Sequence, residues 1–147
     1  MGDIAPHDHP EMAGDNSVIR RICADHVVPD ENRGGSRLSS ALFKNDPREG
    51  SYLSVDSVHC ITEAGNNPAE FVTTPKWFAA LIITIASLRA SDKATKVGDR
   101  WKIGMVPLPN NDCHGAVWGK ITKGQSNELQ RKSDWLVPAP GVAKLTA

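Results

Sequence analysis

The chain of 147 residues is long enough to bury the core of one domain and too short for two comfortable ones. Its 17 Lys and Arg residues balance its 17 Asp and Glu residues, so no overall field draws it to nucleic acid or to an anionic membrane surface. The longest apolar run, residues 77–88, is too short to cross a bilayer, which predicts a protein with no membrane contact.

The first 16 residues differ in composition from the rest. They hold two prolines, two glycines and few large apolar side chains, so burial cannot offset the entropy lost on ordering them. We therefore expect residues 1–16 to form a disordered leader, residues 17–137 to form one globular domain and residues 138–147 to form a tail.

Within the domain, short apolar stretches alternate with turn-forming residues. The predicted strands are residues 17–23, 37–43, 51–58, 81–85, 100–106 and 114–121. The predicted loops and turns are residues 27–36, 44–50, 91–99 and 107–112. A short helix follows residue 85, and Ser126 caps a second helix over residues 126–136. These elements predict a single small α+β domain with mainly antiparallel strands and two or three short helices.

The two strands over residues 37–43 and 51–58 carry serines where a core strand would carry aliphatic side chains, and we expect them to pair as a hairpin. In the first strand, Leu38 and Ser40 share one face while Arg37 and Ser39 share the other. The polar face therefore turns either into a cleft or into water.

Polar side chains in and after this hairpin suit a nucleotide ligand. The guanidinium of Arg37 can fork onto phosphate oxygens, and the hydroxyls of Ser39 and Ser54 can bond to ribose or amide groups. The carboxylate of Glu63 can anchor a ribose hydroxyl. We expect these side chains, together with Tyr52, to converge on one cleft.

The spacing GGSRLSS followed by GSYLSVDSVHCITEAG resembles the core of the bacterial RES-type toxins, which have the ADP-ribosyltransferase fold. Leu38 and Ser39 stand where that family has Trp-Asn. The resemblance implies an NAD-using enzyme whose catalytic residues are Arg37, Ser54 and Glu63. The resemblance implies that Arg37 contacts the pyrophosphate of NAD and that Tyr52 packs on its nicotinamide. We expect Ser39 and His114 to contribute to cofactor binding as well.

A second resemblance covers more of the chain and implies no activity. It is to small uncharacterised bacterial proteins, and it implies one fold unit over about residues 17–137. The matching residues are Arg37, Ser39, Ser40, Phe43, Leu53, Ser54, Val55, Pro107, Leu108, Pro109, Asn111, His114, Gly119, Lys120, Thr122, Lys123 and Trp135.

The hairpin also fits a protein without catalysis. In that interpretation Arg37 and Ser39 face solvent, and Glu63 lies on a helix surface. The chain would then be a protein-interaction module, such as an accessory or immunity-type partner in a bacterial conflict system of the toxin–antitoxin kind.

The three cysteines are odd in number and widely spaced, which argues against a disulfide framework and favours the reducing cytoplasm. A four-ligand metal site from Cys23, His26, Cys60 and His114 has no Cys-x₂-Cys knuckle to support it, so we expect no metal. Cys113 and His114 are neighbours in sequence and therefore poorly placed to act as a catalytic pair. His114 alone remains a candidate acid, base or ligand donor.

A modest basic edge surrounds the start of the last predicted helix, beside Trp118. It comprises Lys120, Lys123, Arg131 and Lys132. Because the net charge is zero and aromatic residues are scarce, we interpret this edge as a solvated surface and expect no nucleic-acid partner.

Overall fold

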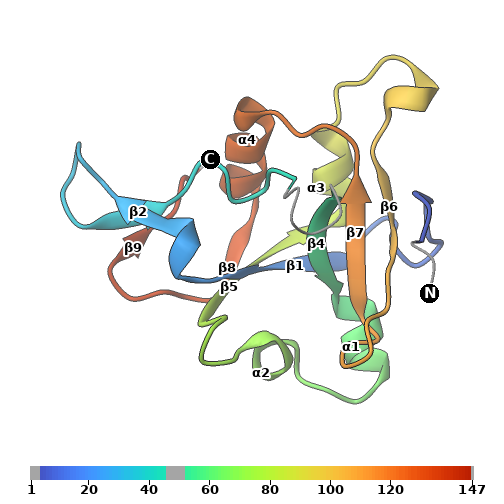
Figure 1. Cartoon of the computed structure of the whole chain (residues 1–147), viewed down its shortest axis with the longest axis horizontal. Helices are drawn as coiled ribbons and strands as arrows, with labels where there is room; N and C mark the ends of the chain where they lie inside the picture. Colours follow the sequence, from blue (N-terminus) through green and yellow to red (C-terminus); the bar gives the residue numbers. More distant parts are fainter. Residues whose placement is uncertain (1–3, 46–51, 147) are drawn as a thin grey trace.

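The computed structural model describes residues 4–45 and 52–146, and it confirms a single small α+β domain with mostly antiparallel strands (Figure 1). The strands are β1 (Ser17–Ile22), β2 (Val27–Pro29), β3 (Ser36–Leu38), β4 (Tyr52–Ser57), β5 (Ala79–Thr84), β6 (Lys102–Met105), β7 (His114–Trp118), β8 (Asp134–Val137) and β9 (Val142–Ala143). The helices are η1 (Ala24–His26), α1 (Val58–Glu63), α2 (Pro68–Val72), α3 (Ile85–Ala90), η3 (Val97–Asp99) and α4 (Lys123–Lys132).

Six strands form the main sheet, in the order β6-β7-β4-β1-β5-β8, and every neighbouring pair is antiparallel. A small second sheet has the order β2-β3-β9, with β3 and β9 parallel. The expected hairpin between the strands of residues 37–43 and 51–58 is therefore wrong. β3 pairs with β2 and β9, whereas β4 pairs with β1 and β7. The expected turn at residues 44–50 lies largely outside the described residues.

Apolar side chains cover both faces of the main sheet. On one face, the larger core cluster joins Val18, Leu53 and Ile103 of the strands to Leu88 of α3 and Leu129 of α4. On the opposite face, a smaller cluster joins Ile19 and Ala80 to Ile61 of α1 and Val72 of α2. Because side chains alternate along a strand, neighbouring residues such as Val18 and Ile19 belong to different clusters. The sheet is thus a layer between two pairs of helices (Figure 1).

The helix starts follow the local capping chemistry. The segment that changes from β5 to α3 confirms the predicted order of strand and then helix, and Thr84 caps α3 by accepting a hydrogen bond from the Ser87 amide at 3.1 Å. α4 begins earlier than predicted because Thr122 and Gln125 form a capping box, whereas Ser126 is buried inside the helix. The predicted end of that helix is wrong as well, since residues 134–137 form β8.

The N-terminal segment, residues 4–16, is attached along the outer edge of β6 rather than separate from the domain. Its Asp8 carboxylate accepts a hydrogen bond from the Ile103 amide at 3.0 Å, and the His9 amide donates to the Ile103 carbonyl at 3.0 Å. Met12 is 2% exposed and belongs to the larger core cluster. An edge strand offers unpaired amides and carbonyls, and these hydrogen bonds fix a segment whose composition alone predicts disorder.

Two glycines make room for this segment, one on each face of the sheet. A Cβ atom on Gly104 would lie 2.6 Å from the imidazole Nε2 of His7, and a Cβ atom on Gly115 would lie 2.5 Å from Cε of Met12. Adjacent strands β6 and β7 carry the two glycines, and successive residues point to opposite faces. Residues 4–16 therefore wrap the edge of the sheet, with His7 over one face and Met12 in the core on the other.

Candidate functional site

The structure does not bring Arg37 and Glu63 together. Arg37 lies in β3 of the small sheet, is exposed, and donates from Nη1 to its neighbour's carbonyl on Leu38 at 3.2 Å. Glu63 ends α1, and its side chain is 70% exposed. Figure 1 shows the small sheet at one end of the long axis of the molecule and α1 toward the other. The single cleft expected from these two residues is not formed by them.

Ser39 has a local role in the structure. Its hydroxyl oxygen accepts a hydrogen bond from the Ala41 amide at 3.1 Å, which shapes the chain after β3. The arginine that contacts this stretch is Arg20 of β1, which is 5% exposed and donates to the carbonyls of Leu42 at 2.9 Å and Ser54 at 3.3 Å. Sequence reasoning gave Arg20 no role, because strand alternation alone does not show which arginine is buried.

Three of the predicted site residues, Tyr52, Ser54 and His114, share one face of the main sheet. In the register of β4 and β7, Tyr52 lies opposite Trp118, and Ser54 lies opposite Ala116. Asp56 lies opposite His114 in the same ladder. Residues directly opposite in an antiparallel pair point to the same face, so all six side chains belong to one surface.

Four rings contact one another in series on this surface, and we call them the aromatic row: His7, Trp118, Tyr52 and His114. The ring centroids are 5.2 Å apart for His7 and Trp118, 5.9 Å for Trp118 and Tyr52, and 6.0 Å for Tyr52 and His114. Such tilted and edge-to-face contacts are the arrangements that ring quadrupoles favour. His7, Tyr52 and Trp118 are half-buried residues.

Small residues lie below the aromatic row, and a cation lies beside it. Ala116 sits between His114 and Trp118 on β7 and is fully buried, and Gly104 lies opposite it on β6. Lys102 of β6 is opposite Trp118 and exposed. The row is therefore flanked on its outer strand by one ammonium group.

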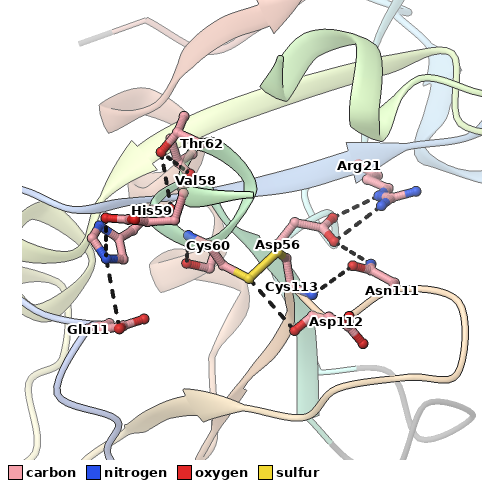
Figure 2. The surroundings of a disulfide bond; sticks show 12 residues. Glu11, Arg21, Asp56, Val58, His59, Cys60, Thr62, Asn111, Asp112 and Cys113 are labelled. Carbon is pink, nitrogen blue, oxygen red and sulfur yellow. Dashed lines mark hydrogen bonds and ion pairs between the residues drawn. A yellow bond between two sulfur atoms is a disulfide. The ribbon is translucent and has the colours of Figure 1, made fainter. Parts of the chain in front are cut away.

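The aromatic row continues into a buried carboxylate. Asp56 is 3% exposed and accepts hydrogen bonds from Arg21 Nε at 2.7 Å, Arg21 Nη2 at 3.2 Å and Asn111 Nδ2 at 2.7 Å (Figure 2). The Arg21 guanidinium also lies 6.0 Å from the ring centroid of Phe71 on α2. Both carboxylate oxygens of Asp56 accept charge-assisted hydrogen bonds. Asp56 therefore links β4 to β1 and to the loop that contains Asn111, rather than serving as a free base.

Beside Asp56, Cys60 and Cys113 form a disulfide with a Cα–Cα distance of 5.4 Å (Figure 2). The number and spacing of the cysteines argue against a disulfide framework, but two of the three are joined in the structure. The two residues are 53 positions apart, but the pairing of β4 with β7 brings the start of α1 next to the end of the 106–113 loop. Cys23 is the remaining cysteine and is free and buried.

His114 is held in one orientation by the same loop. Its ring Nδ1 lies 2.8 Å from the Val106 carbonyl, which can only accept, so Nδ1 carries the hydrogen. In the neutral ring the other nitrogen, Nε2, is then an acceptor. Since the Cys113 sulfur is bonded to Cys60, a Cys113–His114 nucleophile pair is not formed in this state.

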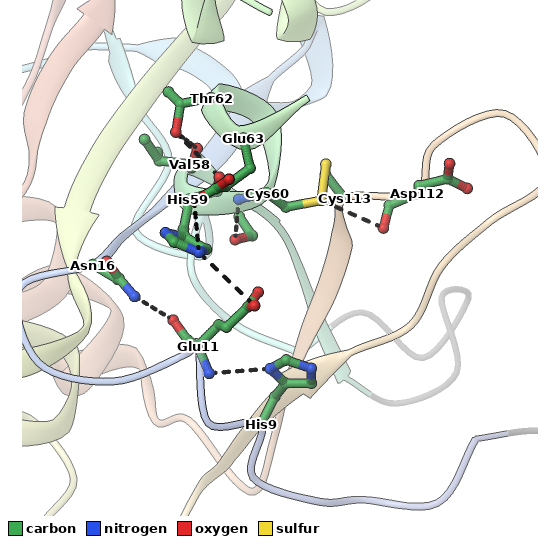
Figure 3. Close-up of polar contacts among 11 residues, drawn as sticks. His9, Glu11, Asn16, Val58, His59, Cys60, Thr62, Glu63, Asp112 and Cys113 are labelled. Atoms are coloured by element: carbon green, nitrogen blue, oxygen red, sulfur yellow. Dashed lines mark hydrogen bonds and ion pairs between the residues drawn. A yellow bond between two sulfur atoms is a disulfide. The ribbon is translucent and has the colours of Figure 1, made fainter. Parts of the chain in front are cut away.

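A second polar cluster joins the N-terminal segment to α1. The His59 Nε2 atom lies 3.8 Å from the Glu11 carboxylate and 3.7 Å from that of Glu63 (Figure 3). The amide of Glu11 in turn donates to His9 Nδ1 at 3.1 Å. This is where the structure places Glu63, in a surface cluster with His59 and Glu11.

The four-residue metal set considered from the sequence is not assembled. Cys60 is committed to the disulfide, and the ring of His26 instead accepts a hydrogen bond from the Cys23 amide at 3.1 Å. Within residues 4–45 and 52–146, no group of three or more His, Cys, Asp or Glu side chains is placed to hold a metal ion. In the same ranges, no helix is long and apolar enough to cross a membrane.

A hollow of about 450 Å³ lies between the N-terminal segment and α3, lined by residues that include Asp8, Met12 and Arg89. Its two charged groups form an ion pair with each other. Burial alone would raise the pKa of Asp8, but hydrogen bonds from the Ile103 amide and the Arg89 guanidinium outweigh it and lower that pKa. The charged groups of the hollow are therefore already paired with each other rather than available to a ligand. We take the aromatic row as the better candidate site.

Sequence reasoning missed His7, Asp56 and Trp118 as members of this face. The signal was present in part, because alternation in HGAVW places His114 and Trp118 together, and alternation in YLSVD places Tyr52 with Asp56. What the pattern lacked was the pairing of the two strands. Comparison of the chain with family models, with curated proteins and with solved structures finds no match.

Proposed function

We propose that this protein is a small nucleotide-binding module that holds the flat ring of its ligand against the aromatic row. The observation that carries the proposal is the series of ring contacts His7–Trp118, Trp118–Tyr52 and Tyr52–His114 at centroid spacings of 5.2 to 6.0 Å, with three of the four residues half-buried. Stacking of a base on an aromatic side chain contributes about 1–3 kcal/mol per ring. Rings that are fixed by their neighbours lose little entropy on binding.

The polar groups beside the row fit the rest of a nucleotide. Lys102 is exposed opposite Trp118 and can contact a phosphate group. Ser54 is half-buried on the same face and suits a ribose hydroxyl or an amide. His114 Nε2, an acceptor in the neutral ring, suits a hydroxyl or amino donor, because its Nδ1 is bonded to Val106.

NAD is the first ligand to test, since the resemblance to RES-type toxins implies it. The proposal keeps Tyr52, Ser54 and His114 as binding residues. It does not include ADP-ribosyl transfer, because Arg37 lies in the small sheet, away from Glu63 and from this face. AMP and nicotinamide mononucleotide divide NAD into its two halves, so they identify which ring the row accepts.

The test is a calorimetric titration of the protein with NAD, AMP and nicotinamide mononucleotide up to millimolar concentration. We expect saturable binding that weakens by about tenfold in Tyr52→Leu or Trp118→Leu, the loss of one stacking contact. Trp77→Leu is the matched control, because Trp77 is a half-buried tryptophan outside the row that stacks on His26 instead. Absence of saturable binding, or equal loss in all three variants, would overturn the proposal.

A second candidate, the protein-interaction module, is favoured by a different surface. Phe78 is 37% exposed, and the preceding Trp77 carries the Lys76 ammonium 5.1 Å from its ring centroid. Tryptophan is enriched at the binding hot spots of protein surfaces. If this patch binds a protein, Phe78→Ser should abolish retention of one defined partner and leave the nucleotide titrations unchanged.

A further inference from the structure

We propose that the Cys60–Cys113 disulfide is a redox control: a dithiol reductant opens it in the folded protein and loosens the 106–113 loop that orients His114. The effect on ligand affinity rests on the proposed nucleotide-binding function. The effect on the loop does not, and the two can be measured separately.

The disulfide lies at the junction of three structures. Cys60 is in the first turn of α1, and its amide donates to Ser57 Oγ at the end of β4 at 3.1 Å. Cys113 ends the loop that joins β6 to β7, and its carbonyl accepts a hydrogen bond from the Ser57 amide at 2.9 Å. The covalent bond is the strongest connection between α1 and this loop.

The loop transmits this connection to the aromatic row. The side-chain oxygen of Asn111 accepts a hydrogen bond from the Cys113 amide at 3.0 Å, and its Nδ2 donates to the Asp56 carboxylate at 2.7 Å. At the other end of the loop, Val106 accepts the hydrogen bond from the His114 ring and donates its amide to the His114 carbonyl at 2.9 Å. A loop that moves relative to α1 therefore changes the orientation of the last ring in the row.

The two cysteine residues differ in exposure, and we infer the direction of attack from this difference. Cys60 is half-buried, whereas Cys113 is 3% exposed. One thiolate of a dithiol attacks the Cys60 sulfur, forming a mixed disulfide, and Cys113 leaves as a thiolate that takes up a proton. The second thiol of the reductant then displaces Cys60 and becomes the other half of a cyclic disulfide. Two electrons and two protons reach the protein in the complete reaction.

The surroundings of Cys60 can accommodate such a reductant. Its neighbour His59 contacts the carboxylates of Glu11, in the N-terminal segment, and Glu63, at the end of α1 (Figure 3). Glu11 and Glu63 are 51% and 70% exposed, so they are free to move aside. The hydrogen bonds through Ser57 and Asn111 do not depend on the disulfide, so we expect the protein to stay folded after reduction while the loop loosens.

The experiment uses the full chain with Cys23→Ser, so that Cys60 and Cys113 are its only cysteines. The oxidised protein is treated with dithiothreitol in native buffer, and hydrogen exchange of residues 106–114 is followed by mass spectrometry. We expect both thiols to become reactive without unfolding, and exchange in this segment to rise by about tenfold while β1 and β5 stay protected. Reduction only in denaturant, or unchanged exchange after reduction, would overturn the proposal.

Binding is measured on the same two samples by titration with NAD and AMP. A severalfold weaker affinity in the reduced form supports the redox control, and equal affinity overturns it. The double variant Cys60→Ser/Cys113→Ser should reproduce the reduced form, and oxidant should not change its affinity. If the oxidised protein binds no nucleotide at all, the proposed function fails, while the exchange rates still decide whether the disulfide controls the loop.

Discussion

The hairpin of β6 and β7 is fastened at two places, and the two fastenings differ in kind. At its loop, the Cys60–Cys113 disulfide ties it covalently to α1. Along its outer edge, residues 4–16 hold it by hydrogen bonds to Ile103, an ion pair of Asp8 with Arg89, and the packing of His7 and Met12. The disulfide is broken only by reduction. The attachment of residues 4–16 consists of several weak contacts, so a change in pH or one added methyl group can weaken it.

The largest effect should come from removing the disulfide. The crosslink closes a loop with a sequence separation of 53, for which chain entropy predicts a stabilisation of about 4 kcal/mol. Urea unfolding of Cys23→Ser, with and without the added Cys60→Ser and Cys113→Ser changes, measures this difference. A loss below about 1 kcal/mol would mean that the denatured chain is already compact near these residues.

The next largest effect should come from Met12→Ala. Met12 is 2% exposed in the larger core cluster, so its truncation leaves a cavity and costs about 2–4 kcal/mol. Met105→Ala, in the partly buried residue at the end of β6, is the control and should cost less. Thermal unfolding of both variants compares them. Equal stability of Met12→Ala and the parent would show that the N-terminal segment contributes nothing to the core.

Gly104→Ala should weaken the same fastening from the opposite face of the sheet. The added Cβ atom would lie 2.6 Å from both the Nε2 and the carbonyl oxygen of His7, so the segment must shift, at a cost of about 1–3 kcal/mol. Gly98→Ala is the control, because no atom lies within 4 Å of its added Cβ. Limited proteolysis should cut residues 4–16 faster in Gly104→Ala and at the parent rate in Gly98→Ala.

The smallest effect should be that of acid. Because the pKa of Asp8 is lowered below its ordinary value of 3.8 in the folded protein, its contribution to stability is present above that value. The contribution is lost as the pH falls through the lowered pKa. Exchange of the Ile103 amide, which donates to Asp8, should therefore accelerate in strong acid relative to a core amide such as that of Ile19. In Asp8→Asn this additional acceleration should disappear. The Cys60–Cys113 disulfide should not respond to the change in pH.

Single residues of the candidate site could be predicted from the sequence, but which of them lie together in space could not. Tyr52, Ser54 and His114 were predicted as site residues from their chemistry and from the resemblance, and strand alternation places each on a definite face. Arg37 and Glu63 were grouped with them because they are close in sequence. That reasoning assumed that consecutive strands pair, and β3 pairs within a different sheet from β4. A register is decided by burial of whole faces, so it is not contained in either strand alone.

By itself, the sequence determined the elements whose cause is local. The α+β class, the strand that changes into a helix at Thr84, and the alternation of HGAVW all follow from side-chain spacing and capping within a few residues. Only the tertiary structure decided which strands are neighbours. That choice joined Cys60 to Cys113, attached residues 4–16 to β6 and gathered four rings from three distant segments. The physical reason is that these contacts depend on the burial of whole sheet faces, to which residues far apart in sequence contribute equally.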